Sequence, residues 1–286
     1  FTITMGPIPA FAILTTIYCA ATFAGAITAI LINTPGTSAS ATTCLDGYPL
    51  AQRGEAGRAL GMAAVSSTIG GIISVVCLMA AAPLLARSAY NFAPPEYFAL
   101  TVFGLSMLAT IGDGSPVKNI LSGAFGILLA TVGIDLLTSV ERFTFDFNEL
   151  SEGIPFVPVM IGVFGISELL VQADNLNVKR KQVVMKSIRL PSMSDYRKVW
   201  KTILRSSGIG TFIGILPAEG ATVASMIGYN EAKRWSKTPE EFGNGSIEGI
   251  AGSEAANNSA TGGAMVPTLA LGIPGSPTAA VILAGL

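Results

Sequence analysis

The sequence has no histidine among its 286 residues, and it has only three cysteines. Without histidine there is no imidazole base, no histidine-liganded metal and no usual hydrolase triad. The cysteines have neither metal-ligand spacing nor a disulfide pattern. No G-x-S-x-G or P-loop spacing occurs either. We therefore expect no catalytic residue, no metal site and no cofactor.

Charge is also scarce. Charged residues make up 12% of the chain, whereas hydrophobic residues make up 50%. A soluble domain carries about 25% charged residues. Several apolar runs approach the roughly 20 residues that a bilayer-spanning helix needs. The composition predicts an all-α polytopic membrane protein in a lipid bilayer.

Basic residues are unevenly distributed, and nine of the 17 lie between Lys179 and Arg205. Short basic loops of membrane proteins stay in the cytoplasm. This predicts a cytoplasmic basic connector at 174–201, between a first-half transmembrane region at 1–173 and the start of a second-half region at 202–286. The same bias explains the basic charges without a nucleic-acid partner.

A polar stretch at 33–40 interrupts the first apolar run, and a similar stretch lies near 272–279. Their Pro-Gly pairs are 239 residues apart (274 − 35). Proline removes a backbone donor and glycine permits unusual dihedral angles, so a spanning helix breaks there. Breaks in corresponding positions of two halves point to a transporter binding site. We predict two related halves, arranged as an inverted repeat, with broken helices at these hinges.

A third Pro/Gly break lies near 214–225. A half-helix that starts at such a break directs N–H groups and partial positive charge at a cavity, which suits a carboxylate. The freed carbonyls are available for Na⁺. The plainer interpretation of each break is a kink or an interhelical loop. The candidate substrate-binding residues are Asn33, Thr34, Pro35, Gly36, Thr37, Ser38, Pro217, Gly220, Thr222, Pro274, Gly275, Ser276 and Thr278.

The segment 248–259 has almost no bulky side chains but carries a carboxylate and two amides. In a helix, Glu254 and Asn257 share a face. An ionisable residue at membrane depth is a functional candidate. The alternative is that Glu254 lies in a solvated loop. The candidates for ion binding or polar support of the breaks are Asn33, Glu254, Asn257 and Asn258.

The chain begins and ends inside apolar sequence, and the break at Pro217 has no counterpart in the first half. We therefore expect a fragment that lacks the N-terminal start and the C-terminal spans of a longer protein.

Six motifs occur in order along the chain: Asn-Thr-Pro-Gly at 33–36, Asp-Gly-Tyr-Pro at 46–49, Gly-Glu-Ala-Gly-Arg-Ala-Leu-Gly at 54–61, Ser-Lys-Thr-Pro-Glu-Glu-Phe-Gly at 236–243, Glu254-x-x-Asn257-Asn258 and Leu-Gly-Ile-Pro-Gly-Ser at 271–276. Together they resemble the large membrane subunit of the tripartite tricarboxylate transporters.

One departure is Leu-Pro-Ala-Glu-Gly at 216–220, where that family usually has Leu-Pro-Gly-x-Gly. A carboxylate there repels an anionic substrate unless it is protonated or paired with a cation.

The resemblance implies a multi-pass carrier of the bacterial inner membrane with about twelve helices in two related halves. It also implies a small membrane subunit and a periplasmic solute-binding protein as partners. The substrate would be citrate or another small carboxylate, and symport with Na⁺ or H⁺ would drive its uptake.

Two alternatives remain at this point. A membrane-embedded enzyme would use Glu254 or Asp113 as an acid or base, but the sequence lacks a nucleophile–base pair. A non-transporting membrane scaffold would accommodate the altered residues Ala218 and Glu219.

Overall fold

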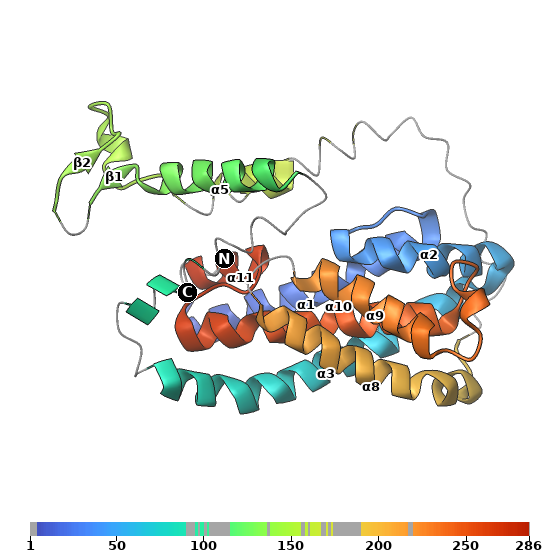
Figure 1. Cartoon of the computed structure of the whole chain (residues 1–286). Helices are drawn as coiled ribbons and strands as arrows, with labels where there is room; N and C mark the ends of the chain where they lie inside the picture. Colours follow the sequence, from blue (N-terminus) through green and yellow to red (C-terminus); the bar gives the residue numbers. More distant parts are fainter. Residues whose placement is uncertain are drawn as a thin grey trace. The chain divides into compact units, whose positions relative to one another are not determined.

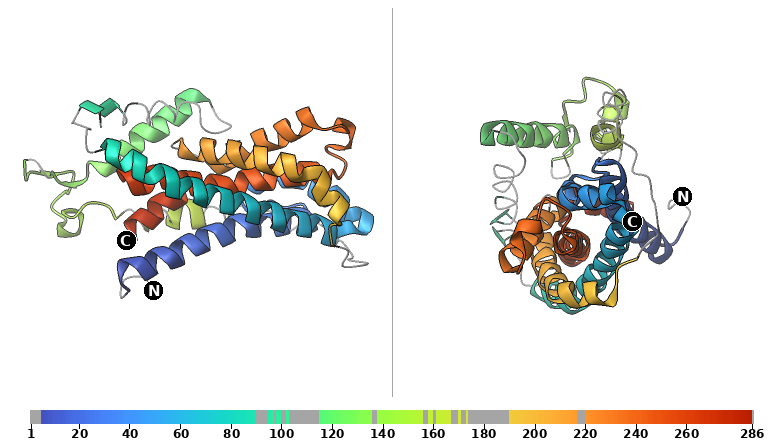
Figure 2. Two further views of the ribbon diagram at one scale, coloured as in Figure 1. Left: turned by 90° about the horizontal axis from the view of Figure 1, so that it is seen from below. Right: turned by 90° about the vertical axis from the view of Figure 1, so that its right-hand side faces the viewer.

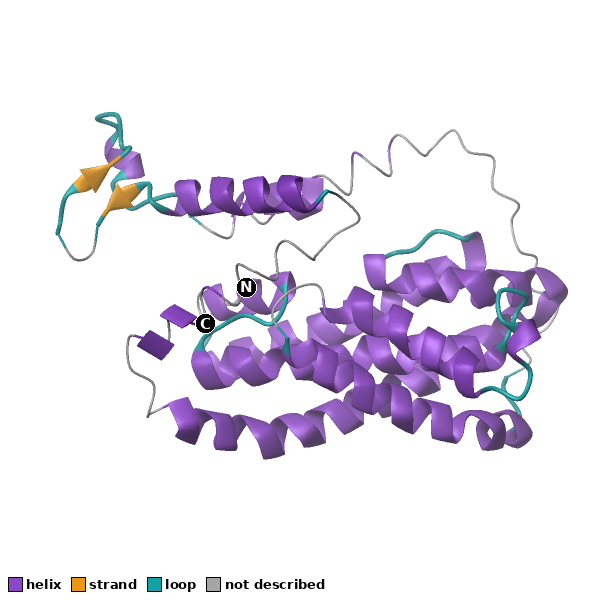
Figure 3. Cartoon of the chain, in the orientation of Figure 1, coloured by secondary structure: helices purple, strands orange, loops and turns teal. Residues whose placement is uncertain are grey.

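The computed structural model describes residues 5–89, 115–135, 138–155, 161–166, 190–216 and 220–285, and single positions at 95, 96, 98, 99, 102, 158, 159, 170 and 173. This part of the chain is helical apart from one short hairpin, as predicted (Figure 3). Two compact units are formed, one by Phe1–Asn91 with Lys179–Leu286 and one by Phe92–Val178. The inverted relation between the halves and the boundaries at 173 and 201 stay predictions.

The first unit is built around one buried helix, α10 (Ile247–Leu271). Helices α1 (Pro7–Ile32), α3 (Ala56–Ala89), α8 (Met193–Ile215) and α9 (Gly220–Trp235) pack against it (Figure 1). The end-on view shows α10 at the centre of these helices (Figure 2). Every residue of α10 from Gly249 to Thr268 is buried.

Small side chains explain how α10 fits among its neighbours. A Cβ on Gly210 of α8 would lie 2.2 Å from the Ala256 carbonyl oxygen. A Cβ on Gly70 of α3 would lie 2.4 Å from the Ala255 carbonyl oxygen. Glycine and alanine let helix backbones approach closely, which is the main packing device where lipid removes the hydrophobic drive. The low bulk of 248–259 is therefore a packing requirement.

Local sequence fixes where the helices begin, turn and end. Pro7 occupies the first turn of α1, where its missing N–H costs nothing. Ser192 caps α8 in a reciprocal capping box with Asp195. Between the short helix α2 (Ala41–Leu50) and α3, the π-helical segment η3 (Ala51–Glu55) contains Gly54 with φ 87°. Glycine tolerates this left-handed conformation, so the chain turns there.

The remaining elements of the first unit are short: two 3-10 helices, η2 (Ser38–Ser40) and η7 (Pro239–Glu241), and the helix α11 (Pro277–Ala284). The largest apolar cluster lies where α1, α2, α3, α8 and α10 meet. Its fully buried members include Ile30, Leu50, Met62, Val199 and Ile250.

Two helical stretches among the described residues are long and apolar enough to cross a membrane. One is Pro7–Ile32, which is α1. The other is the 50-residue stretch Ser38–Arg87, which runs through η2, α2, η3 and α3. Length and composition thus agree with the membrane protein expected from the sequence.

The second unit contains α5 (Pro116–Ala130) and a two-stranded antiparallel hairpin. Strand β1 (Gly133–Ile134) pairs with β2 (Glu141–Arg142) in the register Gly133 opposite Arg142. An ion pair between Arg142 and Asp135 ties the hairpin together. A 3-10 helix, η4 (Asn148–Leu150), and a π-helical segment, η5 (Ile161–Ile166), follow.

Candidate functional site

The first hinge is a complete break between two helices. Helix α1 ends at Ile32, its C-cap Asn33 adopts the left-handed conformation (φ 53°), and Thr37 caps the next helical segment. The Ser40 N–H donates to Thr37 Oγ1 (3.3 Å), and the Thr37 N–H donates to Ser40 Oγ (3.1 Å). The Gly36 N–H donates to the Gly25 carbonyl oxygen (3.3 Å), which folds the hinge back onto α1.

The second hinge has a similar construction. Helix α10 ends at Leu271 and its C-cap Gly272 adopts the left-handed conformation (φ 68°), and Ser276 caps α11 by accepting the Ala279 N–H (3.1 Å). The Gly275 N–H donates to Thr268 Oγ1 (3.2 Å), which folds this hinge back onto α10.

The helix caps and the Pro-Gly glycines of the two hinges correspond at the 239-residue offset, whereas the Gly36 and Gly275 N–H groups have acceptors at different positions. Left-handed caps occur at Asn33 and Gly272, and hydroxyl caps occur at Thr37 and Ser276 (272 − 33 and 276 − 37). A Cβ on the Pro-Gly glycine would strike the residue eleven positions earlier in both cases (36 − 25 and 275 − 264). Its distance to that Cα would be 2.8 Å at Gly36 and 2.7 Å at Gly275. The sequence similarity therefore reflects one local geometry used twice.

The third break approaches the first hinge. Helix α9 begins at Gly220, which packs against Gly214 of α8, and Pro217 with Ala218 and Glu219 lies outside the described residues. Thr222, two residues into α9, has its Oγ1 2.8 Å from Ser38 Oγ. Residues from two predicted halves thus meet at one point.

The hinges differ in which polar groups they leave accessible. Ser38 and Thr278 are exposed, and Ser276 is part-buried with its Oγ 3.0 Å from the Tyr18 hydroxyl of α1. By contrast, the N–H groups of Gly36 and Gly275 are already hydrogen-bonded inside the hinges. The exposed hydroxyl-bearing residues among these are therefore Ser38, which also contacts Thr222, and Thr278.

Glu254 lies inside α10 and is fully buried, so its assignment to a solvated loop is wrong. Three neutral side chains donate to its carboxylate. Thr43 Oγ1 of α2 donates to Oε1 at 2.5 Å, and Ser67 Oγ of α3 donates to Oε2 at 3.0 Å. Asn258 Nδ2, one helical turn along α10, lies 3.3 Å from Oε2. A buried carboxylate needs such partners, because an unpaired buried charge is very costly.

Asn257 stands apart from this cluster. Its side chain is fully buried, and neither Oδ1 nor Nδ2 has a hydrogen-bond partner among the described residues. It shares a helical face with Ser253, which contacts Thr43 of α2, and with Ala264, which packs against Gly275. Native proteins rarely leave a buried amide unsatisfied. This residue is therefore a strong candidate for contact with a ligand.

An open cavity of about 700 Å³ lies beside this cluster, between α1, α3 and α10. Most of its wall is apolar. Its polar wall residues are Thr15 and Thr16 of α1, Ser67 and Thr68 of α3, and Asn258 and Thr261 of α10. Two of the groups that contact Glu254, Ser67 and Asn258, thus also face the cavity.

Sequence reasoning missed Thr43 and Ser67, because single hydroxyls in apolar helices carry no pattern. It also missed a contact between two of the quoted motifs. Asp46 is fully buried, and its Oδ1 accepts backbone N–H groups from Gly243 (2.8 Å), Gly245 (2.9 Å) and Ser246 (2.8 Å). The Asp-Gly-Tyr-Pro motif at 46–49 thereby fixes the loop that leads into α10.

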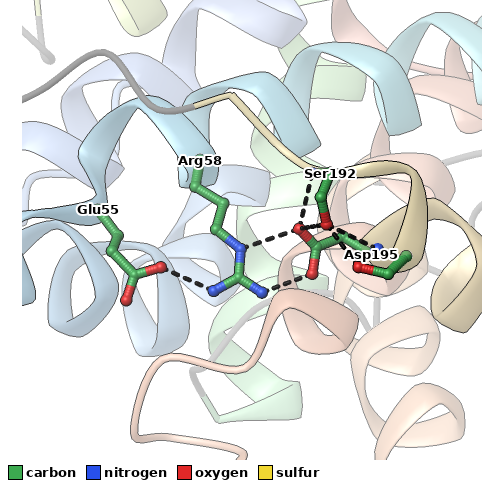
Figure 4. A network of polar contacts seen from close by, with 5 residues as sticks. Glu55, Arg58, Ser192 and Asp195 are labelled. Carbon is green, nitrogen blue, oxygen red and sulfur yellow. Dashed lines mark hydrogen bonds and ion pairs between the residues drawn. The ribbon is translucent and has the colours of Figure 1, made fainter.

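An ionic network joins α3 to α8 (Figure 4). Arg58 donates to both carboxylate oxygens of Asp195, at 3.1 and 2.5 Å, and to Glu55 at 2.7 Å. Asp195 also accepts the Ser192 N–H (2.8 Å). The Arg58 hydrogen bonds, reinforced by Ser192 and opposed by partial burial, lower the pKa of Asp195 to about 2. This network borders a second, polar cavity of about 430 Å³ that Lys198 and Glu248 also line.

Comparisons with known proteins match the chain over its whole length. A family model described as "Tripartite tricarboxylate transporter TctA family" covers residues 1–286. The "Uncharacterized 52.8 kDa protein in TAR-I ttuC' 3'region" of Agrobacterium vitis is 42% identical over 282 residues, which is 99% of this chain and 56% of that protein. The "Uncharacterized protein in TAR-II ttuC' 3'region" of the same organism is 47% identical over 74 residues, 26% of this chain and 31% of that protein. No solved structure matches.

The chain therefore spans about half the length of the first of these relatives. The family model covers every residue that carries the hinges, the Glu254 cluster and the Arg58 network. Two apolar helices of spanning length agree with a membrane location. The chain belongs to the tripartite tricarboxylate transporter TctA family.

Proposed function

We propose that this chain is part of a multi-pass carrier that takes up a small organic carboxylate, a tricarboxylate or dicarboxylate such as citrate, across the bacterial inner membrane. A Na⁺ or H⁺ gradient drives uptake by symport. A small membrane subunit completes the membrane part, and a periplasmic solute-binding protein supplies the substrate. The proposal rests on the family and on one observation, the repeated geometry of the two Pro-Gly hinges.

The substrate site would lie at the hinges. The exposed hydroxyl of Thr278, and the hydroxyls of Ser38 and Thr222 once their mutual contact opens, would donate to carboxylate oxygens, and the hydroxyl-capped helix starts at Thr37 and Ser276 would add partial positive charge. Pro35, Pro274 and Gly220 would shape the backbone, with Asn33, Thr34 and Pro217 completing the breaks. Asn257, with its unpartnered amide, would bind the substrate or the coupled ion from the side of α10.

Alternating access would follow from the breaks. The contact between Ser38 and Thr222 closes the first hinge against α9 at 2.8 Å. Opening this contact would expose the hinge hydroxyls on one side of the membrane. Closing it again would hold the substrate away from that side.

The test is uptake by vesicles that contain the full-length protein with its two partners. Labelled citrate, malate and succinate are supplied with an imposed Na⁺ or H⁺ gradient, one gradient at a time. Uptake of one acid that depends on a gradient is expected. No uptake under either gradient, with the binding protein shown to be loaded, would overturn the proposal and favour the scaffold alternative. The enzyme alternative is excluded, because the family consists of transporter components.

A further inference from the structure

The carboxylate of Glu254 has surroundings that suit a proton better than a metal cation. A Na⁺ site needs several oxygen atoms directed at one point. Here the space around the carboxylate is occupied by donors, namely two hydroxyls and the Asn258 amide nitrogen. No hydrogen bond or ion pair between described residues joins Glu254 to a lysine or an arginine. Neutralisation by a bound proton is therefore the plain alternative to a fixed positive partner.

Most of the titratable groups named here on the surrounding helices have contacts that do not involve Glu254, although Asp46 Oδ2 has no hydrogen-bond partner among the described residues. Asp46 of α2 caps the loop before α10, and Cys44 follows Thr43 directly. Cys19 of α1 contacts Thr261. Further examples are Arg58 of α3 with Asp195, Arg205 of α8 with the Trp235 ring, Tyr229 of α9 with Phe242, and Glu248 of α10 with Thr202.

Ser67 connects the buried carboxylate to the cavity between α1, α3 and α10. Its hydroxyl donates to Glu254 Oε2 and accepts from Asn258 Nδ2 at 2.8 Å, and both residues line the cavity wall. A proton from cavity water can bind the remaining lone pair of Ser67 as the Ser67 proton passes to Oε2. The hydroxyl is neutral before and after the step, and the carboxylate becomes a carboxylic acid.

Thr43 connects the same carboxylate to the first hinge. It lies in α2, the helix that continues directly from the hinge segment Ser38–Ser40, and it donates to Oε1. A proton on Oε2 removes the negative charge that strengthens the Thr43 hydrogen bond to Oε1, so protonation of Glu254 weakens this contact. The protonation state of Glu254 is thus sensed by the helix that carries the candidate substrate hinge.

We propose that Glu254 is the proton-binding residue through which this carrier couples carboxylate uptake to a proton gradient, and that Ser67 transfers the proton between Glu254 and the cavity. The coupling part of this inference rests on the proposed transport function, whereas proton binding by Glu254 does not.

Proton binding is tested on the purified full-length protein by infrared difference spectroscopy during a pH titration. A carboxylic-acid C=O band is expected in the wild type, absent in Glu254→Gln and retained in Glu248→Gln. The Glu248 variant is a matched control, because it makes the same change on the same helix. A wild-type spectrum without a titrating band, or a band that persists in Glu254→Gln, would overturn the proposal.

Coupling is tested in vesicles with the acid among citrate, malate and succinate that the wild type exchanges. An inward gradient of about one pH unit supports about tenfold accumulation per proton. Glu254→Gln should lose this accumulation but keep counterflow exchange, which needs no net proton movement. Full accumulation by this variant would overturn the coupling role and leave the transport function standing. If no acid is exchanged by the wild type, the transport function fails and the infrared result alone decides proton binding.

Proton transfer through Ser67 is tested with a separate pair of variants. The same pair tests the proton path if Glu254→Gln does not fold. Ser67→Ala should slow proton-driven uptake without changing the number of protons carried per substrate. Ser66→Ala is the matched control, since Ser66 is also buried on α3 but its Oγ bonds to no described residue. Equal rates in the two variants would remove Ser67 from the proton path.

Discussion

At the scale of single residues, buried polar groups in this protein fall into two kinds. Asp195 accepts from arginine and Asp46 Oδ1 accepts from backbone N–H groups, so both hold elements in place, although Asp46 Oδ2 has no hydrogen-bond partner among the described residues. Glu254 has only neutral donors, and Asn257 has no partner among the described residues. Satisfied groups stabilise a fold, whereas incompletely satisfied ones cost stability and persist where a ligand uses them.

The ion pair between Asp195 and Arg58 predicts a pH-dependent contribution to stability. The pKa of Asp195 falls from its ordinary 3.8 to about 2, so the folded protein binds this proton more weakly than the unfolded chain does. The stabilisation is present above the unfolded pKa and is lost as the pH falls through about 2. Its size is at most about 2 kcal/mol, because Arg58 is partly exposed and solvent screens the pair. We expect Asp195→Asn to lower the melting temperature at neutral pH.

The measurement is thermal unfolding of both proteins in detergent between about pH 6 and pH 3. The difference between wild type and Asp195→Asn should stay constant above about pH 5 and narrow below about pH 4. Glu149→Gln, a carboxylate change in the second unit, is the control and should leave the melting temperature unchanged. A gap that is independent of pH would show that the ion pair contributes nothing through ionisation.

Replacing Asn257 should not destabilise the protein, in contrast to replacing Asp195. An unsatisfied buried amide costs about 1–3 kcal/mol, so Asn257→Ala should leave the unliganded protein equally stable or make it more stable. The same change should weaken carboxylate uptake, because the ligand loses its contact with α10. Melting curves and the substrate concentration for half-maximal uptake measure the two effects. A marked loss of stability would show that the amide has a structural partner.

At the scale of elements, the central helix depends on close contact through small residues. Gly70 of α3 lies against the Ala255 carbonyl oxygen, whereas the next residue, Gly71, faces open space. The pair thus separates the effect of packing from the effect of helix propensity. Both changes to alanine raise helix propensity by about the same amount.

We expect Gly70→Ala to destabilise the protein by about 1–3 kcal/mol through overpacking. Gly71→Ala should be neutral or slightly stabilising. The two variants are compared by melting temperature and by the yield of folded protein after detergent extraction. Equal behaviour of the two variants would contradict the close approach of α3 and α10.

At the scale of the whole molecule, the sequence predicted the two Pro-Gly hinges, because Pro-Gly pairs report directly on backbone geometry, but it left open whether Glu254 lies in a helix or in a solvated loop. The sequence did not predict the hydrogen bonds between distant segments. Thr43 and Ser67 lie in different helices and gain meaning only when tertiary packing brings them to Glu254. The three N–H groups that converge on Asp46 come from about 200 residues away, a separation at which no periodicity exists.

One such long-range contact, between Ser38 and Thr222, provides a test of whether the first hinge separates from α9 during transport. Their hydroxyl oxygens lie 2.8 Å apart although one follows the first hinge and the other begins α9. Side chains this close can be joined by a disulfide if the backbone geometry permits.

We expect the double variant Ser38→Cys with Thr222→Cys, made without the three native cysteines, to cross-link on oxidation. Because alternating access requires the hinge to separate from α9, oxidation should abolish uptake and reduction should restore it. Each single-cysteine variant controls for the substitutions, since neither can form the bond. A complete cross-link with undiminished uptake would mean that this contact stays closed throughout transport, and the moving boundary would then lie at the second hinge, where Ser276 contacts Tyr18.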